Sequence, residues 1–327
     1  MQKHEKIYVA GHRGLVGSAI VKVLEAKGYS NLLLRTHAEL DLTDGLAVEE
    51  FFKSEKPSYV FLAAAKVGGI HANNSLPAEF IYQNLQIQTN VIHQAWRNQV
   101  KRLLFLGSSC IYPRDCPQPM KEEYLLTGPL EPTNRPYALA KIAGIEMCWA
   151  YNRQYQTHFA AVMPTNLYGP NDNYDLNHSH VIPAMIRRMH EAKVNGQSEV
   201  HLWGTGEPKR EFLYSEDLAD ACVHVMNLSE DKFADTFLSE KSPPIVNVGW
   251  GKDIQIKELA ALIAKTVGFQ GKLVFNADMP DGTPIKLLDT SKVLEIGWKA
   301  RCELREGLER TTKIFLKERE GYDQIPN

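Results

Sequence analysis

The chain has 327 residues, too many for one small domain and too few for three large ones, so one α/β domain with a smaller appendage is expected. The formal net charge of −2 and the lack of long runs of like charge argue against a nucleic-acid partner and a membrane-binding helix, so the expected partner is a small molecule. Five cysteines without a Cys-x-x-Cys pair, a polar N-terminus and no apolar run of about 18 residues predict free thiols, no metal site, no membrane span and a cytoplasmic location.

A glycine-rich turn follows the first short apolar run, residues 6–10. From Gly11 to Gly17 the glycines recur at every third position (G-x-x-G-x-x-G), and a helical pattern then continues until Gly28. Glycines at a strand-to-helix turn let the backbone approach a dinucleotide pyrophosphate, whose charge the helix N-terminus stabilises. Tight turns without a function also use glycines, but the strand before and the helix after make this spacing a strong prediction of a dinucleotide site.

Two arginines favour NADP(H) as that dinucleotide. Arg35 ends the second apolar run, residues 32–35, and Arg13 lies inside the glycine-rich turn. A carboxylate at this strand end would bind the ribose hydroxyls of NAD, whereas a cation accommodates the 2′-phosphate of NADP. A lone arginine in such a turn is usually only solvated, so the prediction depends on the pair.

Short apolar runs continue to alternate with amphipathic helical patterns up to about residue 165. Further strands are expected near 58–64, 103–108 and 159–163. This alternation is typical of βαβ units, so we predict a Rossmann-like, doubly wound parallel sheet in an α/β fold. The helix expected at 80–98 has more apolar surface than one stripe needs, which predicts a partner helix, from this chain or from a second subunit; the second subunit is the basis for expecting a homodimer.

Groups with catalytic potential follow the strand at 103–108. Ser108 lies where that strand ends, and Tyr137 and Lys141 come later at helical i,i+4 spacing, which places both on one helix face. An unperturbed tyrosine has a pKa of about 10, and a neighbouring ammonium lowers that pKa by favouring the phenolate. We therefore predict that Lys141 makes Tyr137 an unusually acidic phenol that works near neutral pH.

The composition of the sequence changes after residue 165, because a polar loop rich in Asn and Asp spans 171–179. Two later segments, a strand at 211–214 with a helix at 215–228 and a strand at 245–249, are expected to rejoin the sheet of the first domain. The predicted domains are a dinucleotide-binding domain at 1–165 plus about 211–249, and a smaller, discontinuous α/β substrate-binding domain at about 166–210 plus 250–327.

Taken together, the glycine-rich turn, the serine at a strand end and the Y-x-x-x-K spacing resemble the extended short-chain dehydrogenase/reductases that act on nucleotide sugars. The resemblance narrows to the GDP-L-fucose synthase family and covers nearly the whole chain. The strings that carry it are A-A-A-K-V-G-G-I at 63–70, G-S-S-C-I-Y-P at 107–113, M-P-T-N-L-Y-G-P at 163–170 and S-H-V-I-P-A at 179–184. It implies conversion of GDP-4-keto-6-deoxy-D-mannose to GDP-L-fucose, by epimerisation at C3 and C5 and reduction at C4 with NADPH.

The resemblance also implies a role for each catalytic group. Ser108 and Tyr137 reach the oxygen on C4, Tyr137 protonates that oxygen as hydride arrives, and Lys141 holds the cofactor ribose. Cys110 and His180 match the acid–base pair that inverts C3 and C5, and which of them accepts the proton stays open. Their ordinary pKa values, about 8.5 and about 6.5, suit either role near neutral pH. Without the resemblance, a buried apolar role for the cysteine and a cap or surface role for the histidine would be the simpler interpretations.

Contacts to the cofactor and the substrate follow from the same resemblance and from the glycine-rich turn. The cofactor-binding residues are expected to be Gly11, His12, Arg13, Gly14, Leu15, Val16, Gly17, Arg35, His37, Asp41, Leu42, Leu106, Gly107, Ser109, Lys141, Pro164, Asn166, Leu167 and His180. The substrate-binding residues are expected to be Arg188, Trp203, Arg210, Asp281 and Lys286, with the two arginines on the diphosphate. Arg187, the neighbour of Arg188, is expected to have no specific role.

The chain departs from the family pattern at two positions. His37 stands where a second arginine is frequent, which weakens the preference for NADP because a mostly neutral imidazole contributes less to a 2′-phosphate. Ile285 stands where a basic residue is frequent, which alters the rim of the substrate site without removing a catalytic group.

Two other functions are compatible with parts of this pattern. A nucleotide-sugar 4-epimerase or 4,6-dehydratase would be expected to keep an acid at the end of the second strand, or an acidic pair beside the serine motif, where this chain has Ser109 and Cys110. A non-enzymatic dinucleotide-binding protein would be expected to have lost Tyr137 or Lys141, and both are present.

Overall fold

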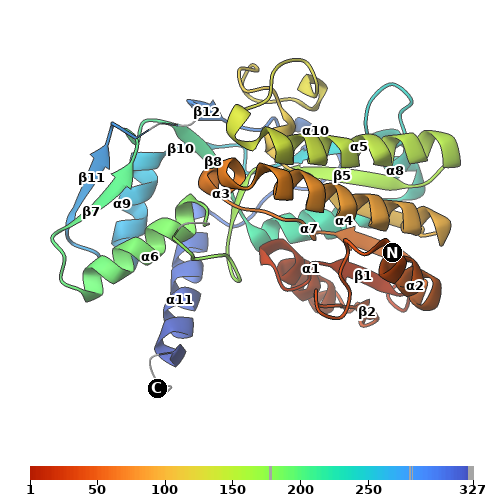
Figure 1. The fold of residues 1–327 in the computed structure, drawn as a ribbon, viewed down its shortest axis with the longest axis horizontal. Helices are drawn as coiled ribbons and strands as arrows, with labels where there is room; N and C mark the ends of the chain where they lie inside the picture. The colour runs from red at the N-terminus through yellow and green to blue at the C-terminus, as the bar shows by residue number, and fades with distance from the viewer. Residues whose placement is uncertain (177–178, 280, 282, 323–327) are drawn as a thin grey trace.

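A six-stranded parallel sheet organises the larger part of the molecule (Figure 1). The computed structural model describes residues 1–176, 179–279, 281 and 283–322. Across the sheet the strands follow the order β2-β1-β3-β4-β5-β9, and every pair is parallel. Their bounds are β1 Ile7–Ala10, β2 Leu32–Leu33, β3 Tyr59–Leu62, β4 Arg102–Leu106, β5 Phe159–Pro164 and β9 Ile245–Val248. The predicted doubly wound parallel sheet is therefore confirmed, with its change of winding direction between β1 and β3.

Helices cover both faces of this sheet, which explains why β1, β3, β4, β5 and β9 are buried along their whole length. One buried cluster joins one face of the sheet to α1 and α7, and the other joins the opposite face to α2, α4 and α5. The bounds are α1 Leu15–Ala26, α2 Gly45–Glu55, α3 Ile70–Ser75, α4 Pro77–Arg97, α5 Arg135–Tyr155, α7 Ser215–Met226, α8 Glu230–Phe237 and α10 Ser291–Glu295. Short 3-10 turns complete this part at η1 Ser109–Ile111, η2 Glu122–Tyr124 and η3 Pro132–Asn134.

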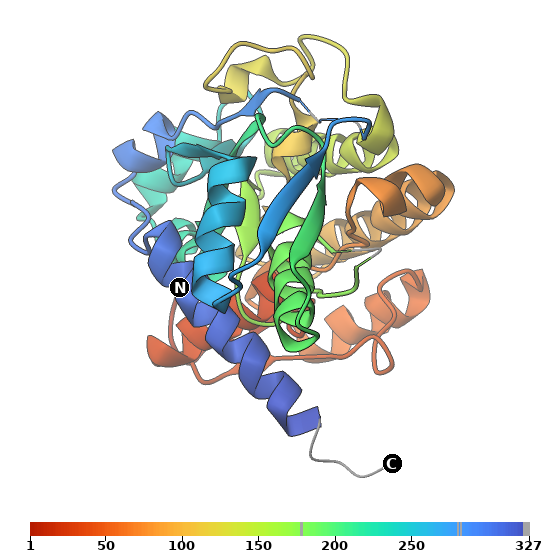
Figure 2. The same cartoon turned by 90° about the vertical axis from the view of Figure 1, so that its left-hand side faces the viewer.

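The smaller part has its own core, in which Ile186, Ile263 and Phe315 meet between three helices. Figure 2 looks onto this part, with α6, α9 and α11 facing the viewer beside the β7–β11 ribbon. Its elements are β6 Asn166–Tyr168, α6 Val181–Val194, β7 Glu199–Trp203, β8 Lys209–Tyr214, β10 Asp253–Gln255, α9 Ile256–Val267, β11 Lys272–Asn276, β12 Ile285–Lys286 and α11 Leu304–Tyr322.

One strand does not lie where the sequence predicts. β8 pairs with β6, β10 and β12 in a separate sheet, so the expectation that residues 211–214 rejoin the main sheet is wrong. The reason is that β9 already occupies the position beside β5, while β6 follows β5 almost directly and supplies β8 with a parallel partner. The helix that follows β8, α7, packs against α1 as predicted for the first domain. Among the described residues, no helix combines the length and apolar character needed to cross a bilayer.

Candidate active site

The glycine-rich turn between β1 and α1 closes too tightly for side chains at two of its three glycines. Gly11 has a φ of +82°, and a Cβ on Gly17 would lie 2.1 Å from the carbonyl oxygen of Gly11. Gly14 is exposed, and a Cβ there would meet no atom nearer than 3.6 Å. Within the described chain, no side chain caps the N-terminus of α1, so its first N–H groups remain available to an anion. The turn therefore fits the pyrophosphate of a dinucleotide.

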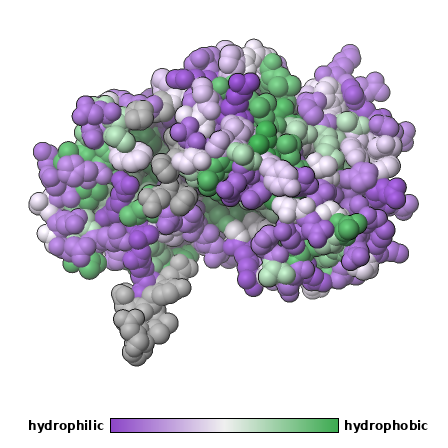
Figure 3. Space-filling model, in the orientation of Figure 1, coloured by the Kyte–Doolittle hydropathy of each residue, from purple (hydrophilic) through white to green (hydrophobic). Residues whose placement is uncertain are grey.

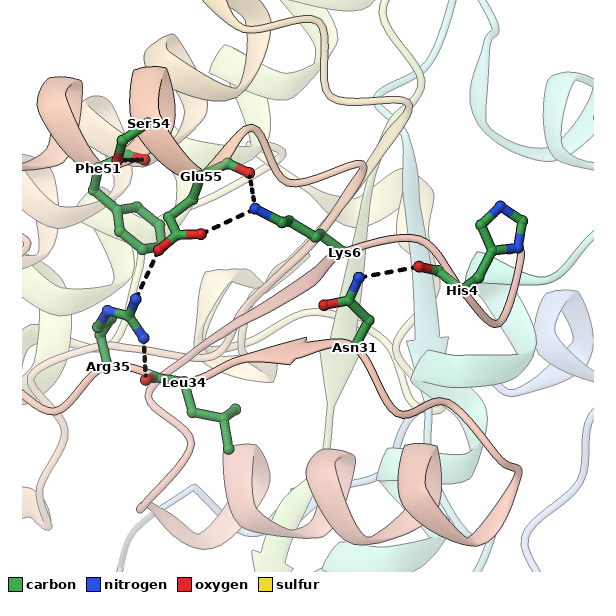
Figure 4. A network of polar contacts seen from close by, with 8 residues as sticks. All are labelled: His4, Lys6, Asn31, Leu34, Arg35, Phe51, Ser54 and Glu55. Atoms are coloured by element: carbon green, nitrogen blue, oxygen red, sulfur yellow. Dashed lines mark hydrogen bonds and ion pairs between the residues drawn. The ribbon is translucent and has the colours of Figure 1, made fainter.

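Arg35 is held in place just beyond β2 by a carboxylate at the end of α2 (Figure 4). Its Nη2 donates a hydrogen bond to Glu55 Oε1 at 2.8 Å, and its Nη1 donates to the carbonyl oxygen of Leu34 at 3.0 Å. The other carboxylate oxygen of Glu55 accepts from Lys6 Nζ at 3.1 Å, so two cations share one carboxylate. The guanidinium carbon also lies 5.7 Å from the centroid of the Phe51 ring. Arg35 is thus preorganised, and its charge is only partly neutralised.

The other residues expected to bind the adenosine part of the dinucleotide are more exposed to solvent than Arg35. Arg13 is exposed in the turn, and the His37 side chain is 83% exposed, 3.7 Å from Asp41. Asp41 itself accepts hydrogen bonds from the backbone N–H and the hydroxyl of Thr43, which lower the pKa of its carboxyl. His12 is different, because its Nδ1 is buried without a partner among the described residues, and burial together with Arg13 lowers the pKa of its imidazole.

The predicted catalytic tyrosine and lysine meet at the carboxyl end of β4. Lys141 Nζ donates a hydrogen bond to the carbonyl oxygen of Leu106 at 2.7 Å and lies 5.7 Å from the centroid of the Tyr137 ring. Ser108 follows β4 and caps η1, where its hydroxyl accepts from the backbone N–H of Cys110 at 3.4 Å. The i,i+4 spacing on α5 therefore brings the pair together at Ser108, as predicted.

The predicted acidic phenol is wrong for this structure. Burial raises the pKa of Tyr137 well above its usual range, Cys110 raises it further, and a hydrogen bond with Ser108 opposes these effects only in part. Lys141 is not among the groups that lower the pKa of Tyr137. Burial also lowers the pKa of the Lys141 amine itself, from 10.5 to about 8. The physical reason is that the ammonium is buried and directed to Leu106, so desolvation dominates over charge attraction.

Cys110 and His180 come from different parts of the chain, and Lys286 influences both. Cys110 is buried in η1, and burial raises the pKa of its thiol, while Lys286, Ser108 and Lys141 lower it. His180 is the N-cap residue of α6 but makes no capping hydrogen bond through its side chain. His180 is exposed at the start of α6, and the protein around it lowers the pKa of its imidazole by desolvation, as does the charge of Lys286. Figure 3 shows the surface hollowed between the two parts of the molecule.

The substrate candidates lie along β7, β8 and β12, on the smaller part. Arg210 and Lys286 are register partners in the parallel pair of β8 and β12. Arg210 Nη1 donates to the carbonyl oxygens of Lys209 at 2.7 Å and Thr283 at 2.5 Å, and burial lowers the pKa of its guanidinium while Asp281 raises it.

Two further substrate candidates flank the turn after β7. The oxygens of Asp281 accept from the backbone N–H of Thr205 at 3.0 Å and from its hydroxyl at 2.6 Å. Trp203 ends β7 just before that turn and is 59% exposed, so its ring is open to a ligand rather than part of the core.

The two neighbouring arginines on α6 differ in the way the sequence analysis expects. Arg187 is occupied, since its Nε donates to Glu191 at 2.7 Å and its Nη1 donates to the carbonyl oxygen of Tyr174 at 3.0 Å. Over the ranges that the structure describes, no hydrogen bond or ion pair engages the guanidinium of Arg188. Arg188 is therefore free to meet an anion, and Arg187 is not.

Other predicted cofactor contacts cluster at the ends of β4 and β5. A Cβ on Gly107 would lie 2.2 Å from the terminal methyl of Met163, so the chain here has no room for a side chain. Asn166 Nδ2 already donates to the carbonyl oxygen of Glu211 at 2.9 Å. Leu15 and Val16 lie in the first turn of α1, and Leu42 lies beyond β2. Leu106 ends β4 and Ser109 begins η1. Pro164 and Leu167 lie at the junction of β5 and β6.

Two aromatic residues shape the site without having been predicted from the sequence. The Phe80 ring on α4 meets the Tyr137 ring edge-on, with centroids 6.2 Å apart, and the Phe105 ring centroid lies 4.7 Å from Lys141 Nζ. Both residues belong to apolar runs that are typical of a buried core. Only the packing of α4 and α5 on β4 identifies them as walls of the site.

Comparison with known proteins agrees with this architecture. Residues 7–249 match the model of the "NAD dependent epimerase/dehydratase family". The chain is 58% identical to "Putative GDP-L-fucose synthase 2" of Arabidopsis thaliana, over 97% of this chain and 93% of the relative, and 52% identical to "GDP-L-fucose synthase" of Escherichia coli strain K12, over 97% and 98%. A solved GDP-mannoheptose C4 reductase from Campylobacter jejuni with NADP bound superposes with a TM-score of 0.87 at 41% identity, covering 97% of this chain and 99% of that one. The chain therefore belongs to the NAD-dependent epimerase/dehydratase family and, within it, to the GDP-L-fucose synthase family.

Proposed function

We propose that this protein is an NADP-dependent oxidoreductase with epimerase activity that converts GDP-4-keto-6-deoxy-D-mannose to GDP-L-fucose. Identity of 52% or more to relatives named for this activity supports the assignment. The observation that carries it in the structure is the cluster at the carboxyl end of β4, where Cys110 in η1 follows Ser108 and Lys141 lies against the Tyr137 ring, while His180 begins α6 and shares with Cys110 the influence of Lys286. A plain reductase needs one proton donor, whereas an epimerase needs groups on two faces of a sugar ring.

Epimerisation begins with removal of the proton at C3 or C5, both of which flank the C4 ketone. The resulting enolate places negative charge on the C4 oxygen, where donors aimed at that oxygen stabilise it. Ser108 and Tyr137 are those donors, since their hydroxyls meet at the end of β4. Cys110 and His180 provide one group that accepts a proton and another that returns one from the opposite face, because a single group tends to return the proton to its original side.

In the reduction step, the bound NADPH would supply the hydride to C4. Tyr137 then donates its phenolic proton to the C4 oxygen. Burial raises the pKa of Tyr137, which keeps the phenol protonated and ready to donate at neutral pH. A developing alkoxide is a much stronger base than a carboxylate or imidazole, so it takes a proton even from a phenol of raised pKa.

The cofactor is held by two groups of residues. The uncapped first turn of α1 binds the pyrophosphate, and Arg35 with Arg13 binds the 2′-phosphate of NADP. Lys141, whose ammonium is held at the carbonyl oxygen of Leu106 at the end of β4, would contact the nicotinamide ribose. The solved Campylobacter reductase with NADP bound supports NADP as the cofactor of this fold.

The GDP portion of the substrate lies against the smaller part of the molecule. Arg188, with an unengaged guanidinium, and Arg210 bind the diphosphate, since planar guanidinium groups match phosphate oxygens. Trp203 packs on the nucleotide, and Asp281 and Lys286 complete the substrate side.

The active protein is a cytoplasmic homodimer in this proposal. Large hydrophobic side chains are exposed on α4 and α5, among them Tyr82 at 62%, Leu139 at 39% and Tyr155 at 40%. Figure 3 shows hydrophobic residues reaching the surface over the first turns of α5. A second copy that covers these helices would bury them. The five free cysteines suit a reducing compartment.

Identification of the product tests the proposal directly. The purified protein is incubated with GDP-4-keto-6-deoxy-D-mannose and NADPH, and the sugar is identified by NMR. GDP-L-fucose is the expected product, formed with consumption of one NADPH. Recovery of the D-manno or D-talo reduced sugar, without inversion at C3 and C5, would show that the chain is only a reductase.

A further inference from the structure

Glu55 takes no part in the proposed proton and hydride transfers, yet its carboxylate holds the cofactor residue Arg35 (Figure 4). It is the last residue of α2, and its side chain is 25% exposed. Its Oε1 accepts a hydrogen bond from Arg35 Nη2 at 2.8 Å. Across the residues that the structure describes, Glu55 is the one carboxylate that forms an ion pair with Arg35. The direction of the guanidinium therefore depends on Glu55 more than on any other acid of the described chain.

The contacts of Arg35 fix its guanidinium and still leave donors for a ligand. Nη2 donates to Glu55, and Nη1 donates to the carbonyl oxygen of Leu34 at 3.0 Å. The guanidinium carbon lies 5.7 Å from the centroid of the Phe51 ring, which comes from the last turns of α2. A guanidinium has five N–H donors in one plane, so two bonds that fix this plane leave the other donors pointing in set directions. These donors can meet the oxygens of a phosphate.

Lys6 holds Glu55 in turn and offsets its charge. Lys6 Nζ donates to Glu55 Oε2 at 3.1 Å and to the backbone carbonyl oxygen of Glu55 at 2.9 Å. The first bond fixes the carboxylate, and the second fixes the C-terminal end of α2 against the residue that precedes β1. Two cations and one carboxylate leave this cluster with a net formal charge of +1. Glu55 therefore fixes Arg35 without cancelling the attraction of the cluster for an anion.

The exposure of this ion pair indicates a role in binding and not in stability. The side chains of Arg35 and Glu55 are 33% and 25% exposed, and ion pairs that remain open to solvent contribute little to the free energy of folding. Binding is different, because a long side chain that must be ordered by its ligand weakens the affinity. A guanidinium that is already held by the protein avoids that loss.

We propose that Glu55 is a positioning residue that determines the preference for NADPH over NADH, by holding the guanidinium of Arg35 for the 2′-phosphate. The inference rests on the proposed function, in which Arg35 binds that phosphate. NADH has no 2′-phosphate, so its binding does not depend on this contact. The preference between the two cofactors is thus the quantity that Glu55 controls.

The test measures Kd for NADPH and for NADH by isothermal titration calorimetry, with the whole chain and no sugar. Glu55→Ala is expected to raise Kd for NADPH about five- to tenfold, as loss of a positioned charged hydrogen bond predicts, and to leave Kd for NADH within about twofold. Glu55→Gln keeps an oxygen that accepts from Arg35, so it is expected to restore most of the preference. Glu49→Ala is the matched control, because Glu49 lies on the same helix and pairs with Lys53 at 2.5 Å. It is expected to change neither Kd.

A double-mutant cycle shows whether Glu55 acts through Arg35. In the Arg35→Met background, Glu55→Ala is expected to have no further effect on Kd for NADPH, because the group that it positions is gone. Kd for NADPH that stays constant or falls in Glu55→Ala would overturn the proposal. Equal losses with both cofactors, or an undiminished effect of Glu55→Ala in the Arg35→Met background, would also overturn it. Glu55→Met, which keeps the length of the side chain, repeats the measurement should the Ala variant fail to fold.

Failure of this inference and failure of the proposed function give different results. A chain that makes no GDP-L-fucose but loses its NADPH preference in Glu55→Ala loses the function and keeps the positioning role. A chain that makes GDP-L-fucose, with a cofactor preference that ignores Glu55, keeps the function and loses the positioning role.

Discussion

The ammonium of Lys141 lies 5.7 Å from the centroid of the Tyr137 ring, yet it donates its hydrogen bond to the carbonyl oxygen of Leu106 instead of meeting the phenol. Lys141 is buried and Tyr137 is half-buried, and desolvation disfavours the charged form of each. The pair therefore consists of a protonated phenol and a weakened cation. This arrangement suits a proton donor, which must be neutral before it acts.

Replacement of Tyr137 by Phe tests its role as that donor. The variant keeps the ring and its edge-on contact with Phe80, so folding and NADPH binding are expected to be nearly unchanged. Reduction of the keto sugar is expected to slow by about 10²- to 10⁴-fold, because no other hydroxyl delivers the proton in the same geometry. Stopped-flow oxidation of NADPH measures this step. Tyr82→Phe, on an exposed residue of α4, serves as the control, and equal rates in the two variants would exclude Tyr137 as the donor.

Burial of Lys141 predicts a pH-dependent free energy of unfolding. The pKa of the amine is about 8 in the folded chain and 10.5 in the ordinary state, so the unfolded chain binds more protons between these values. Stability of the cofactor-free protein is therefore expected to rise with pH from about 8 to about 10.5. At 1.36 kcal/mol for each pKa unit, burial of the charge costs about 3 kcal/mol below pH 8.

Lys141→Met removes this contribution. The variant is expected to be more stable than the wild type at pH 7, and the difference is expected to disappear as pH approaches 10.5. Urea unfolding at several pH values measures it, with Lys265→Met on the exposed face of α9 as the control. A constant difference between Lys141→Met and the wild type across this range would contradict the assigned burial of charge.

The main sheet could be predicted because local patterns determine it. Short apolar runs separated by helical patterns require parallel strands, and glycines at 11, 14 and 17 identify the first turn. β8 could not be assigned, because a strand of six residues carries no signal for which sheet it joins; that depends on β6, a three-residue strand that sequence patterns do not reveal.

The candidate site was predictable as a set of residues but not as an electrostatic environment. Helical spacing is enough to bring Tyr137 to Lys141. The sign of the pKa shift at Tyr137 depends on burial, to which the Phe80 ring contributes, and on the charge influence of Cys110. Both residues come from distant segments. The shift also depends on Leu106, which takes the hydrogen bond of Lys141. A sequence motif carries no information on contacts with distant segments, and the prediction of an acidic phenol failed for this reason.

The acid–base pair can be examined through exchange of substrate protons with solvent. In heavy water, wild-type protein is expected to place deuterium at C3 and C5 of the product. Cys110→Ala and His180→Ala are each expected to slow incorporation at one or both carbons by about 10²-fold or more, and Cys110→Ala is expected to keep NADPH binding. NMR of the sugar measures this. Cys148→Ala, at a buried cysteine of α5 outside the site, is the control. Wild-type exchange in both site variants would remove Cys110 and His180 from the mechanism.

Selectivity for NADPH depends on Arg35 in our proposal. Arg35→Met removes the cation that Glu55 holds beyond β2, and kcat/KM with NADPH is expected to fall about tenfold or more. The value with NADH is expected to change little, because NADH has no 2′-phosphate. Arg97→Met, on an exposed arginine at the end of α4, controls for loss of surface charge. Equal losses of kcat/KM with NADPH and NADH in Arg35→Met would show that Arg35 supports the fold and does not bind the 2′-phosphate.

The neighbouring residues Arg187 and Arg188 offer an internal comparison for the diphosphate site. Arg188 has an unengaged guanidinium, so Arg188→Met is expected to raise KM for the GDP-sugar about tenfold or more, as loss of a charged hydrogen bond predicts. Arg187 is committed to Glu191 and to the carbonyl oxygen of Tyr174, so Arg187→Met is expected to lower the melting temperature while KM stays close to the wild-type value. Initial rates at varied substrate, together with thermal melts, separate the two effects. The reverse pattern, with KM responding to Arg187 and not to Arg188, would place the diphosphate on the other side of α6.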